Sequence, residues 1–336
     1  MDSKDAAPIR VRLAAVPDGL PVAKTWAWTH EPAREPVEGE VTLAVKYISI
    51  DPAMAGWVQP VRSYSAPVGV GEVMRAFGIG QVTASRAEKF KVGDYVFTFT
   101  GVQTDVTLPA KGLRKLDPNL VPLPKYLGGL GWTGFTGYFG MSDIGQPAEG
   151  ETVVVSAAAG AVGSVAAQVA RIKGARVIGI AGGPEKCRYL MEELNLHAAI
   201  DYKSADVGAE LSRLAPEGID VYFDNVGGAT LDAVLARIKR RARIVLCGGI
   251  ASYGDLRNAH GPANYLQLVA QSGTMRGFTM LDYLDRIPEA GMALGGWMLE
   301  GKLKTREHIV KGIRQFPEAL AMLYAGGNHG KLMIEV

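Results

Sequence analysis

The chain has 336 residues, 36 basic and 34 acidic side chains, a formal net charge of +2 and 48% apolar residues. This composition excludes a disordered chain, and it lacks the basic excess that nucleic-acid or anionic-membrane partners require. The length predicts about two domains. Two cysteines, Cys187 and Cys247, are too few for a disulfide framework, and no apolar run suits a signal peptide or a membrane span. We therefore expect a cytoplasmic protein.

The first part of the chain is expected to be rich in β-structure. The segment 40–50, EVTLAVKYISI, alternates in polarity and is rich in β-branched residues, as in a strand. Further short strands are expected at 78–84, 94–100 and 103–108, between residues that favour turns. The proline-rich stretch 116–124 cannot be helical throughout and predicts a domain boundary.

The second part of the chain alternates between short apolar strands and helical stretches. Strands are expected at 152–156, 176–180, 198–201, 220–224, 243–247 and 274–280. Helices are expected at 165–173, 184–194 and 231–238. This rhythm predicts a right-handed βαβ series, and therefore an α/β domain with a doubly wound parallel sheet of the Rossmann type. The last stretch, 316–336, predicts a helix, a turn and a strand that could join either this sheet or the first domain.

A glycine motif follows the first of these apolar strands. It has the spacing Ala158-x-Gly160-x-x-Gly163 and leads directly into a helical stretch. In this context the motif predicts a dinucleotide site, in which Gly160, Ala161, Val162 and Gly163 hold a pyrophosphate at the helix N-terminus. The alternative is a tight strand–helix turn that binds no ligand.

The end of the second strand indicates which nicotinamide cofactor is bound. NAD sites usually carry an acidic residue there, whereas this chain has Ile180-Ala181-Gly182-Gly183 followed by Lys186. A cation at this position suits a 2′-phosphate, so the sequence predicts NADP(H). Glu185 complicates this interpretation unless it points outward, and Lys186 could instead belong to a solvated helix face.

Several longer segments resemble one family, the zinc-independent medium-chain dehydrogenases/reductases, in the branch of prostaglandin reductases, leukotriene B4 dehydrogenase and alkenal double-bond reductases. The segments are 49–57, 67–85, 131–140, 157–164, 224–228, 247–253 and 327–336. The resemblance implies a GroES-like domain, 1–125 completed by 298–336, and a Rossmann NADP-binding domain, 126–297. It also implies a homodimer, joined through the edges of the parallel sheets.

The resemblance also implies roles for individual residues. Lys186 and Tyr202 would hold the 2′-phosphate, and Asn225 would face the nicotinamide ribose. The remaining cofactor contacts would come from Cys247, Gly248, Tyr253, Phe278, Thr279, Met280 and Asn328. Tyr47, Phe77 and Tyr253 would line the substrate site. Turn formation remains the alternative for Asn225 and Asn328, a surface position for Tyr202, and core packing for Tyr47 and Phe77. For Tyr253 the alternative is a residue that orders its loop or holds the cofactor phosphate.

The residues that could bind zinc are not arranged as a site. The five histidines are scattered, and Gly69-Val70-Gly71-Glu72 stands where related zinc enzymes have Gly-His-Glu. We therefore expect chemistry that needs no metal, and the resemblance implies that this chemistry is the reduction of carbon–carbon double bonds in enals and enones. Tyr253 would be the catalytic residue, donating to the enolate oxygen. The alternatives are a quinone oxidoreductase and a non-catalytic NADPH-binding protein.

Overall fold

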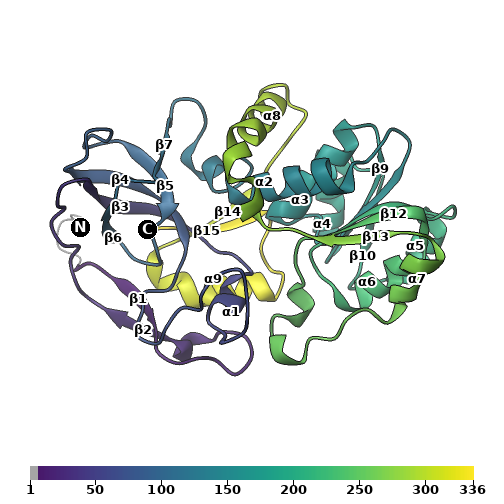
Figure 1. The fold of residues 1–336 in the computed structure, drawn as a ribbon, viewed down its shortest axis with the longest axis horizontal. Coiled ribbons are helices and arrows are strands. Elements are labelled where there is room, and N and C mark those ends of the chain that lie inside the picture. The colour runs from purple at the N-terminus through teal and green to yellow at the C-terminus, as the bar shows by residue number, and fades with distance from the viewer. Residues whose placement is uncertain (1–6) are drawn as a thin grey trace. The chain divides into compact units, whose positions relative to one another are not determined.

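The computed structural model describes residues 7–336, which form two compact units (Figure 1). The first unit contains the chain up to Leu127, with Glu307–Asn328 and Leu332–Val336. The second unit contains Gly128–Arg306 and His329–Lys331. These bounds differ from the predicted ones, because residues 298–306 lie in the second unit and residues 329–331 return to it. Residues 1–6 of the predicted first domain lie outside the described part.

The sheet of the first unit is mainly antiparallel and runs in the order β14-β15-β3-β4-β5-β7, with β6 also paired to β3. The strands are β3 (Glu40–Ser49), β4 (Phe77–Ser85), β5 (Tyr95–Phe99), β6 (Asp105–Pro109), β7 (Arg114–Leu116), β14 (Glu307–Lys311) and β15 (Lys331–Glu335). The last strand, β15, pairs antiparallel with β3, with Met333 opposite Ser49. The C-terminal strand, which could have joined either the parallel sheet or the first domain, therefore belongs to the sheet of the first unit.

Smaller elements complete the first unit. A two-stranded sheet and two helices are formed by β1 (Arg10–Leu13), β2 (Trp26–Thr29), α1 (Met54–Trp57) and α9 (Phe316–Tyr324). The rings of Trp26 and Phe316 meet edge to face, with 5.0 Å between their centroids. This contact joins the C-terminal helix to the N-terminal hairpin, so residues far apart in the sequence build one core.

The second unit is built on a six-stranded parallel sheet of order β10-β9-β8-β11-β12-β13. Its strands are β8 (Thr152–Val155), β9 (Arg176–Ala181), β10 (Ala198–Asp201), β11 (Ile219–Asp224), β12 (Ile238–Leu246) and β13 (Thr274–Gly277). The chain runs outward from β8 in one direction and then, from β11, in the other. This doubly wound order confirms the predicted fold class, and its switch point lies between β8 and β11, where such folds bind ligands.

Helices cover both faces of this parallel sheet. They are α2 (Trp132–Phe139), α3 (Ala161–Ile172), α4 (Pro184–Arg188), α5 (Val207–Leu214), α6 (Gly228–Leu235), α7 (Leu266–Ala270) and α8 (Ile287–Leu299). Successive residues of β8 serve opposite faces, because Val153 and Val155 belong to one buried cluster and Val154 to the other. Burial on both faces is why these strands read as continuous apolar runs.

Two predicted elements differ in detail from the expectation. The stretch predicted to be helical at 184–194 is helical from Pro184 to Glu193, but it is an α-helix only to Arg188 and continues as a π-helix, Tyr189–Glu193. The strand predicted at 274–280 ends at Gly277, so residues 278–280 leave the sheet. Within the described residues, no helix combines the length and apolarity needed to cross a membrane.

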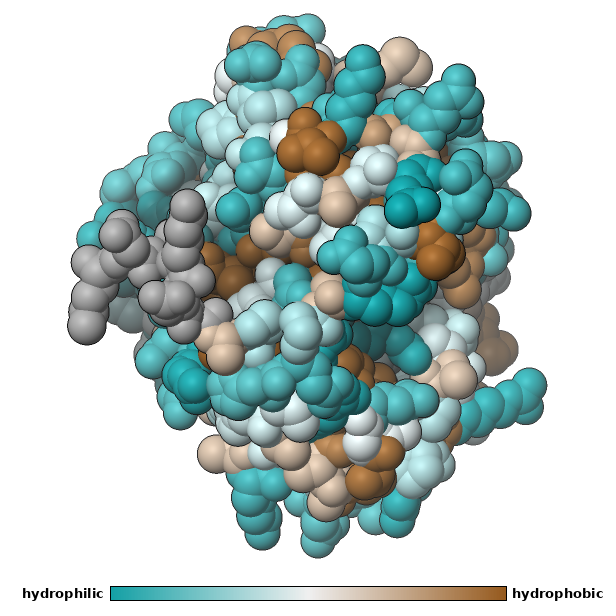
Figure 2. Space-filling model, turned by 90° about the vertical axis from the view of Figure 1, so that its left-hand side faces the viewer, coloured by the Kyte–Doolittle hydropathy of each residue, from teal (hydrophilic) through white to brown (hydrophobic). Residues whose placement is uncertain are grey.

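The face of the molecule in Figure 2 is mostly hydrophilic, with hydrophobic residues in separate spots.

Candidate functional site: a dinucleotide-binding edge

The turn between β8 and α3 presents backbone N–H groups at one end of the parallel sheet. Gly160 is the N-cap of α3, and the N–H of Ser164 donates to the oxygen of Gly160 at 3.0 Å. The preceding N–H groups, of Ala161, Val162 and Gly163, have no acceptor inside the helix. Together with the positive end of the helix dipole they form an arrangement suited to a phosphate.

Gly163 is required by a close approach of backbone to backbone. A Cβ built on it would lie 2.3 Å from the carbonyl oxygen of Ala157, well inside van der Waals contact. The turn itself is tight, since Ala157 has a φ of +47°, in the left-handed region. The first turn of α3 can therefore pack this closely against the strand end only with glycine at 163.

The C-terminal segment returns to this turn. Gly330 forms a parallel β-bridge with Gly160, and the N–H of Lys331 donates to the oxygen of Arg306 at 2.8 Å. Gly330 has a φ of +73°, and a Cβ on it would lie 2.0 Å from the oxygen of Arg306. Residues 329–331 therefore lie beside the dinucleotide turn. Asn328, the residue of this segment predicted to contact cofactor, directly precedes them but belongs to the first unit.

Basic and aromatic side chains gather at the ends of β9 and β10. The carboxylate of Asp201 accepts from the N–H groups of Gly183 and Lys203, at 2.7 and 3.0 Å. This fixes the loop that carries Tyr202, whose ring lies within 2.8 Å of a Cβ built on Gly182. The predicted cofactor residue Tyr202 is thus placed directly against the end of the second strand.

Lys186 lies close to a second lysine in this region. Its pKa is lowered, first by burial and then by the positive charge of Lys203, while Glu185 acts in the opposite direction. The carboxylate of Glu185 lies 3.6 Å from Nδ1 of His329. Two cations in one neighbourhood favour a bound anion, because they repel each other when it is absent. The sequence interpretation named Lys186 but missed Lys203, whose only local signal was its place just after the third strand.

Asn225 is held at the end of β11 by Ser156. Its backbone N–H donates to Oγ of Ser156 at 2.9 Å, and its side-chain amide donates to the backbone oxygen of Ser156 at 2.7 Å. Ser156 is fully buried at the end of β8. The side chain of Asn225 is therefore fixed at the switch point between β8 and β11, next to the dinucleotide turn.

Tyr253 lies over the end of β12. A Cβ on Gly248 would be 3.2 Å from the Tyr253 hydroxyl and 3.4 Å from the backbone oxygen of Asn225. The predicted residues Asn225, Gly248 and Tyr253 thus meet at one place. Cys247, which directly follows the same strand, is half-buried, and desolvation of its thiol, followed by the charge of Asp224, raises its pKa to about 12. Its thiol therefore stays protonated at neutral pH.

The segment 278–280 is predicted to contact the cofactor, but most of its side chains pack into the protein. The ring of Phe278 lies within 2.7 Å of a Cβ built on Gly140, and Met280 is buried. Thr279 caps the following turn, with its N–H donating to Asp282 at 3.3 Å. Phe278 and Met280 thus point into the core, so a cofactor contact from this segment would have to use its backbone or Thr279.

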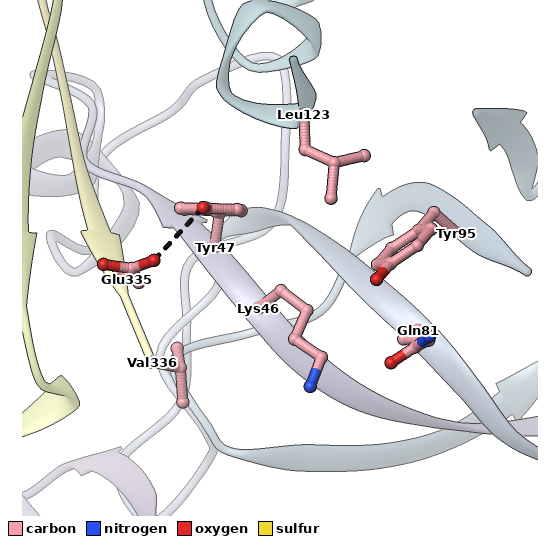
Figure 3. Close-up of a pocket in the computed structure, with 7 residues that line it drawn as sticks. All are labelled: Lys46, Tyr47, Gln81, Tyr95, Leu123, Glu335 and Val336. Atoms are coloured by element: carbon pink, nitrogen blue, oxygen red, sulfur yellow. Dashed lines mark hydrogen bonds between the residues drawn. The ribbon is translucent and has the colours of Figure 1, made fainter. Parts of the chain in front are cut away.

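The two predicted substrate residues of the first unit have definite partners. The hydroxyl of Tyr47 donates to Oε1 of Glu335 at 3.2 Å, and the two line a cavity of about 290 Å³ (Figure 3). Burial first, and then Glu335, raise the pKa of Tyr47. Phe77 is 7% exposed and stacks on Phe99, with 3.9 Å between ring centroids. Their contact with substrate stays a prediction.

The chain is similar to known oxidoreductases over nearly its whole length. Family models described as the N-terminal domain of oxidoreductase and as zinc-binding dehydrogenase match residues 10–116 and 161–294. An NADPH-dependent curcumin reductase of Escherichia coli is 38% identical over 96% of this chain and 95% of its own. The 2-alkenal reductase (NADP(+)-dependent) of Nicotiana tabacum is 36% identical over 89% and 88%. The crystal structure of CurA from Vibrio vulnificus in complex with NADPH has a TM-score of 0.92 at 40% identity, covering 98% of this chain and 99% of that one.

The chain belongs to the medium-chain dehydrogenase/reductase family, as the resemblance of its motifs indicated. Although one matching model is described as zinc-binding, residues 7–336 contain no group of three or more His, Cys, Asp or Glu side chains that could hold a metal ion. As a family member it needs a nicotinamide cofactor, and its residues fit one. Gly163 lets the first turn of α3 pack closely against the end of β8, and the unpaired N–H groups at this helix start suit a pyrophosphate.

Proposed function

We propose that this protein is an NADPH-dependent reductase of carbon–carbon double bonds conjugated to a carbonyl, acting on α,β-unsaturated aldehydes and ketones without a metal. The single observation that carries the cofactor assignment is the pair formed by Lys186, in the helix α4 that follows β9, and Lys203, just after β10. An NAD enzyme would have an acidic residue in this region. The reaction type is supported by relatives of 36% and 38% identity that are named as alkenal and curcumin reductases.

NADPH would be held along the carboxyl edge of the parallel sheet. The N–H groups of residues 161–163 would bind the pyrophosphate, and Lys186, Tyr202 and Lys203 would surround the 2′-phosphate. Asn225, with the backbone of Gly248, would face the nicotinamide half. When bound, the cofactor supplies a hydride for the β-carbon of the substrate.

Tyr253 would serve as the proton donor or hydrogen-bond donor. As the β-carbon of an enone accepts hydride, negative charge moves to the carbonyl oxygen, and a phenol O–H placed there stabilises the resulting enolate. The assignment is supported by the Tyr253 hydroxyl, which lies 3.2 Å from a Cβ built on Gly248, a residue proposed to face the nicotinamide half. Protonation of the α-carbon then gives the saturated carbonyl product.

We also propose that two copies associate through the edge strand β13. This strand ends the parallel sheet, and Thr274, Arg276 and Gly277 are exposed on it. Its open backbone N–H and C=O groups would pair with those of a second copy. Equilibrium sedimentation should then give twice the chain mass, and a monomer mass at micromolar concentration would contradict this. A cytoplasmic location stays a prediction.

One assay tests the proposed activity against its rival. NADPH oxidation is followed with trans-2-alkenals, an α,β-unsaturated ketone and a quinone, at equal concentrations. We expect turnover of the alkenals and the ketone, with the saturated carbonyl compound as product. Turnover of the quinone alone would indicate a quinone oxidoreductase, and NADPH binding without turnover of any of these would indicate a binding protein.

A further inference from the structure

Asp224 is a buried acidic residue at the switch point of the parallel sheet to which no role has yet been given. It is 1% exposed and ends β11, directly before Asn225. One of its carboxylate oxygens, Oδ1, accepts four hydrogen bonds: from the hydroxyls of Tyr222 and Ser156, at 2.7 and 3.1 Å, and from the N–H groups of Val226 and Gly227, at 2.9 and 3.0 Å.

The second carboxylate oxygen of Asp224, Oδ2, has a different environment. Oδ2 is buried and has no hydrogen-bond partner within the described residues. A buried acceptor without a donor destabilises a protein, and an apolar residue would avoid that cost. Capping the short helix α6 does not require burial of a carboxylate, since helix caps such as Asp206 on α5 work at the surface. The burial of Asp224 therefore needs a further reason.

The hydrogen bonds of Asp224 converge on the residues around Asn225. Ser156 donates to Asp224 and at the same time accepts from the N–H of Asn225, so one hydroxyl links the two residues. The backbone oxygen of Asp224 accepts from the N–H groups of Cys247 and Gly248, at 2.9 and 3.1 Å. A single residue thus ties together the ends of β8, β11 and β12.

We propose that Asp224 is a positioning residue, which acts through Ser156 and through the N–H groups of Val226 and Gly227 to hold Asn225 and its loop for the nicotinamide half of the cofactor. This inference rests on the proposed function, because that function assigns Asn225 to the nicotinamide side. The adenosine half would bind elsewhere, at Lys186, Tyr202 and Lys203, and does not depend on Asp224.

Because the two halves of the cofactor would be held by different residues, the proposal can be tested by binding rather than by activity. Affinities for NADPH and for 2′,5′-ADP, which carries only the adenosine half, are measured by calorimetry on the full chain. Asp224→Asn preserves the shape and removes the charge, and Ser156→Ala removes the linking hydroxyl. Each should weaken NADPH binding by about tenfold, the scale of one hydrogen bond to a charged group, and leave the affinity for 2′,5′-ADP within about twofold of wild type.

Two further variants separate positioning from a general loss of structure. Tyr222→Phe removes a donor to Asp224 and a contact with the Ser156 hydroxyl but leaves both hydrogen bonds between Ser156 and Asn225, so NADPH affinity should change less than about threefold. Asp206→Asn changes a cap on α5 and should change neither affinity. Equal weakening of NADPH and 2′,5′-ADP by Ser156→Ala, or unchanged NADPH binding in both Ser156→Ala and Asp224→Asn, would overturn the proposal. Failure to reduce any enone would count against the proposed function but leaves these affinities interpretable.

Discussion

Gly163→Ala is the substitution whose consequence follows most directly from the geometry. The added Cβ would lie 2.3 Å from the oxygen of Ala157, whereas unstrained contacts need about 3.5 Å. The helix end must therefore move by about 1 Å relative to the turn. A shift of that size takes N–H···O contacts of about 2.9 Å out of hydrogen-bonding range.

The loss of NADPH affinity and of folding stability can be calculated from this shift. Loss of two charge-assisted hydrogen bonds to the pyrophosphate, at about 1.5 kcal/mol each, gives about 3 kcal/mol, or roughly 100-fold weaker NADPH binding. Forcing the extra methyl group into the packed turn should also lower the free energy of unfolding by about 1–3 kcal/mol. Fluorescence titration with NADPH and urea denaturation measure the two effects separately.

A matched substitution in the same unit controls for the added methyl group. Gly296 lies inside α8, and a Cβ built on it meets no described atom within 4 Å. Gly296→Ala should leave NADPH affinity unchanged and stabilise the helix by about 1 kcal/mol. If Gly163→Ala bound NADPH as tightly as Gly296→Ala does, the turn would not be the pyrophosphate site.

Four further predictions concern the cofactor end, the proton donor, the metal and the thiol. Lys186→Ala should raise KM for NADPH by about tenfold to a hundredfold and reduce the preference for NADPH over NADH. An unchanged NADPH/NADH preference would show that Lys186 does not belong to the 2′-phosphate site. Tyr253→Phe should lower kcat by about 10²–10³ with little change in NADPH affinity, and the reverse pattern would make Tyr253 a cofactor contact only. Exhaustive chelation should leave activity intact, and about one zinc per chain whose removal abolishes activity would refute the metal-free mechanism. Because the pKa of Cys247 is raised to about 12, its thiolate is scarce at pH 8, and its alkylation by iodoacetamide should be about a thousandfold slower than that of a free cysteine; modification at the rate of a free cysteine would contradict the raised pKa.

The sequence was sufficient for the parallel sheet because its signals are local. The strands β8 to β11 and the last part of β12 are short apolar runs followed by a turn, and the spacing of Gly160 and Gly163 depends only on the strand and helix that flank it. The fold class and the position of the dinucleotide turn follow from these patterns. The change to a π-helix after Arg188 and the end of β13 at Gly277 were not predicted, because neither is accompanied by a clear change in polarity.

What the sequence missed depends on contacts between distant residues. Lys203 lies close to Lys186 only because β9 and β10 pair, and Gly330 reaches Gly160 from the other end of the chain. The direction of Tyr47 is set by Glu335, 288 residues away. No pattern within a short window contains these pairings. Asp224 was visible only as part of a motif, and its role depends on Ser156, which pairing of β8 and β11 brings beside it.

The fate of the hydride tests the central proposal most directly. The protein is incubated with NADPH deuterated at nicotinamide C4 and with a trans-2-alkenal, and the product is examined by NMR. Reduction of the conjugated double bond predicts one deuterium at the β-carbon and an intact aldehyde. Deuterium at the carbonyl carbon, giving an allylic alcohol, or the absence of deuterated product would contradict the proposed function.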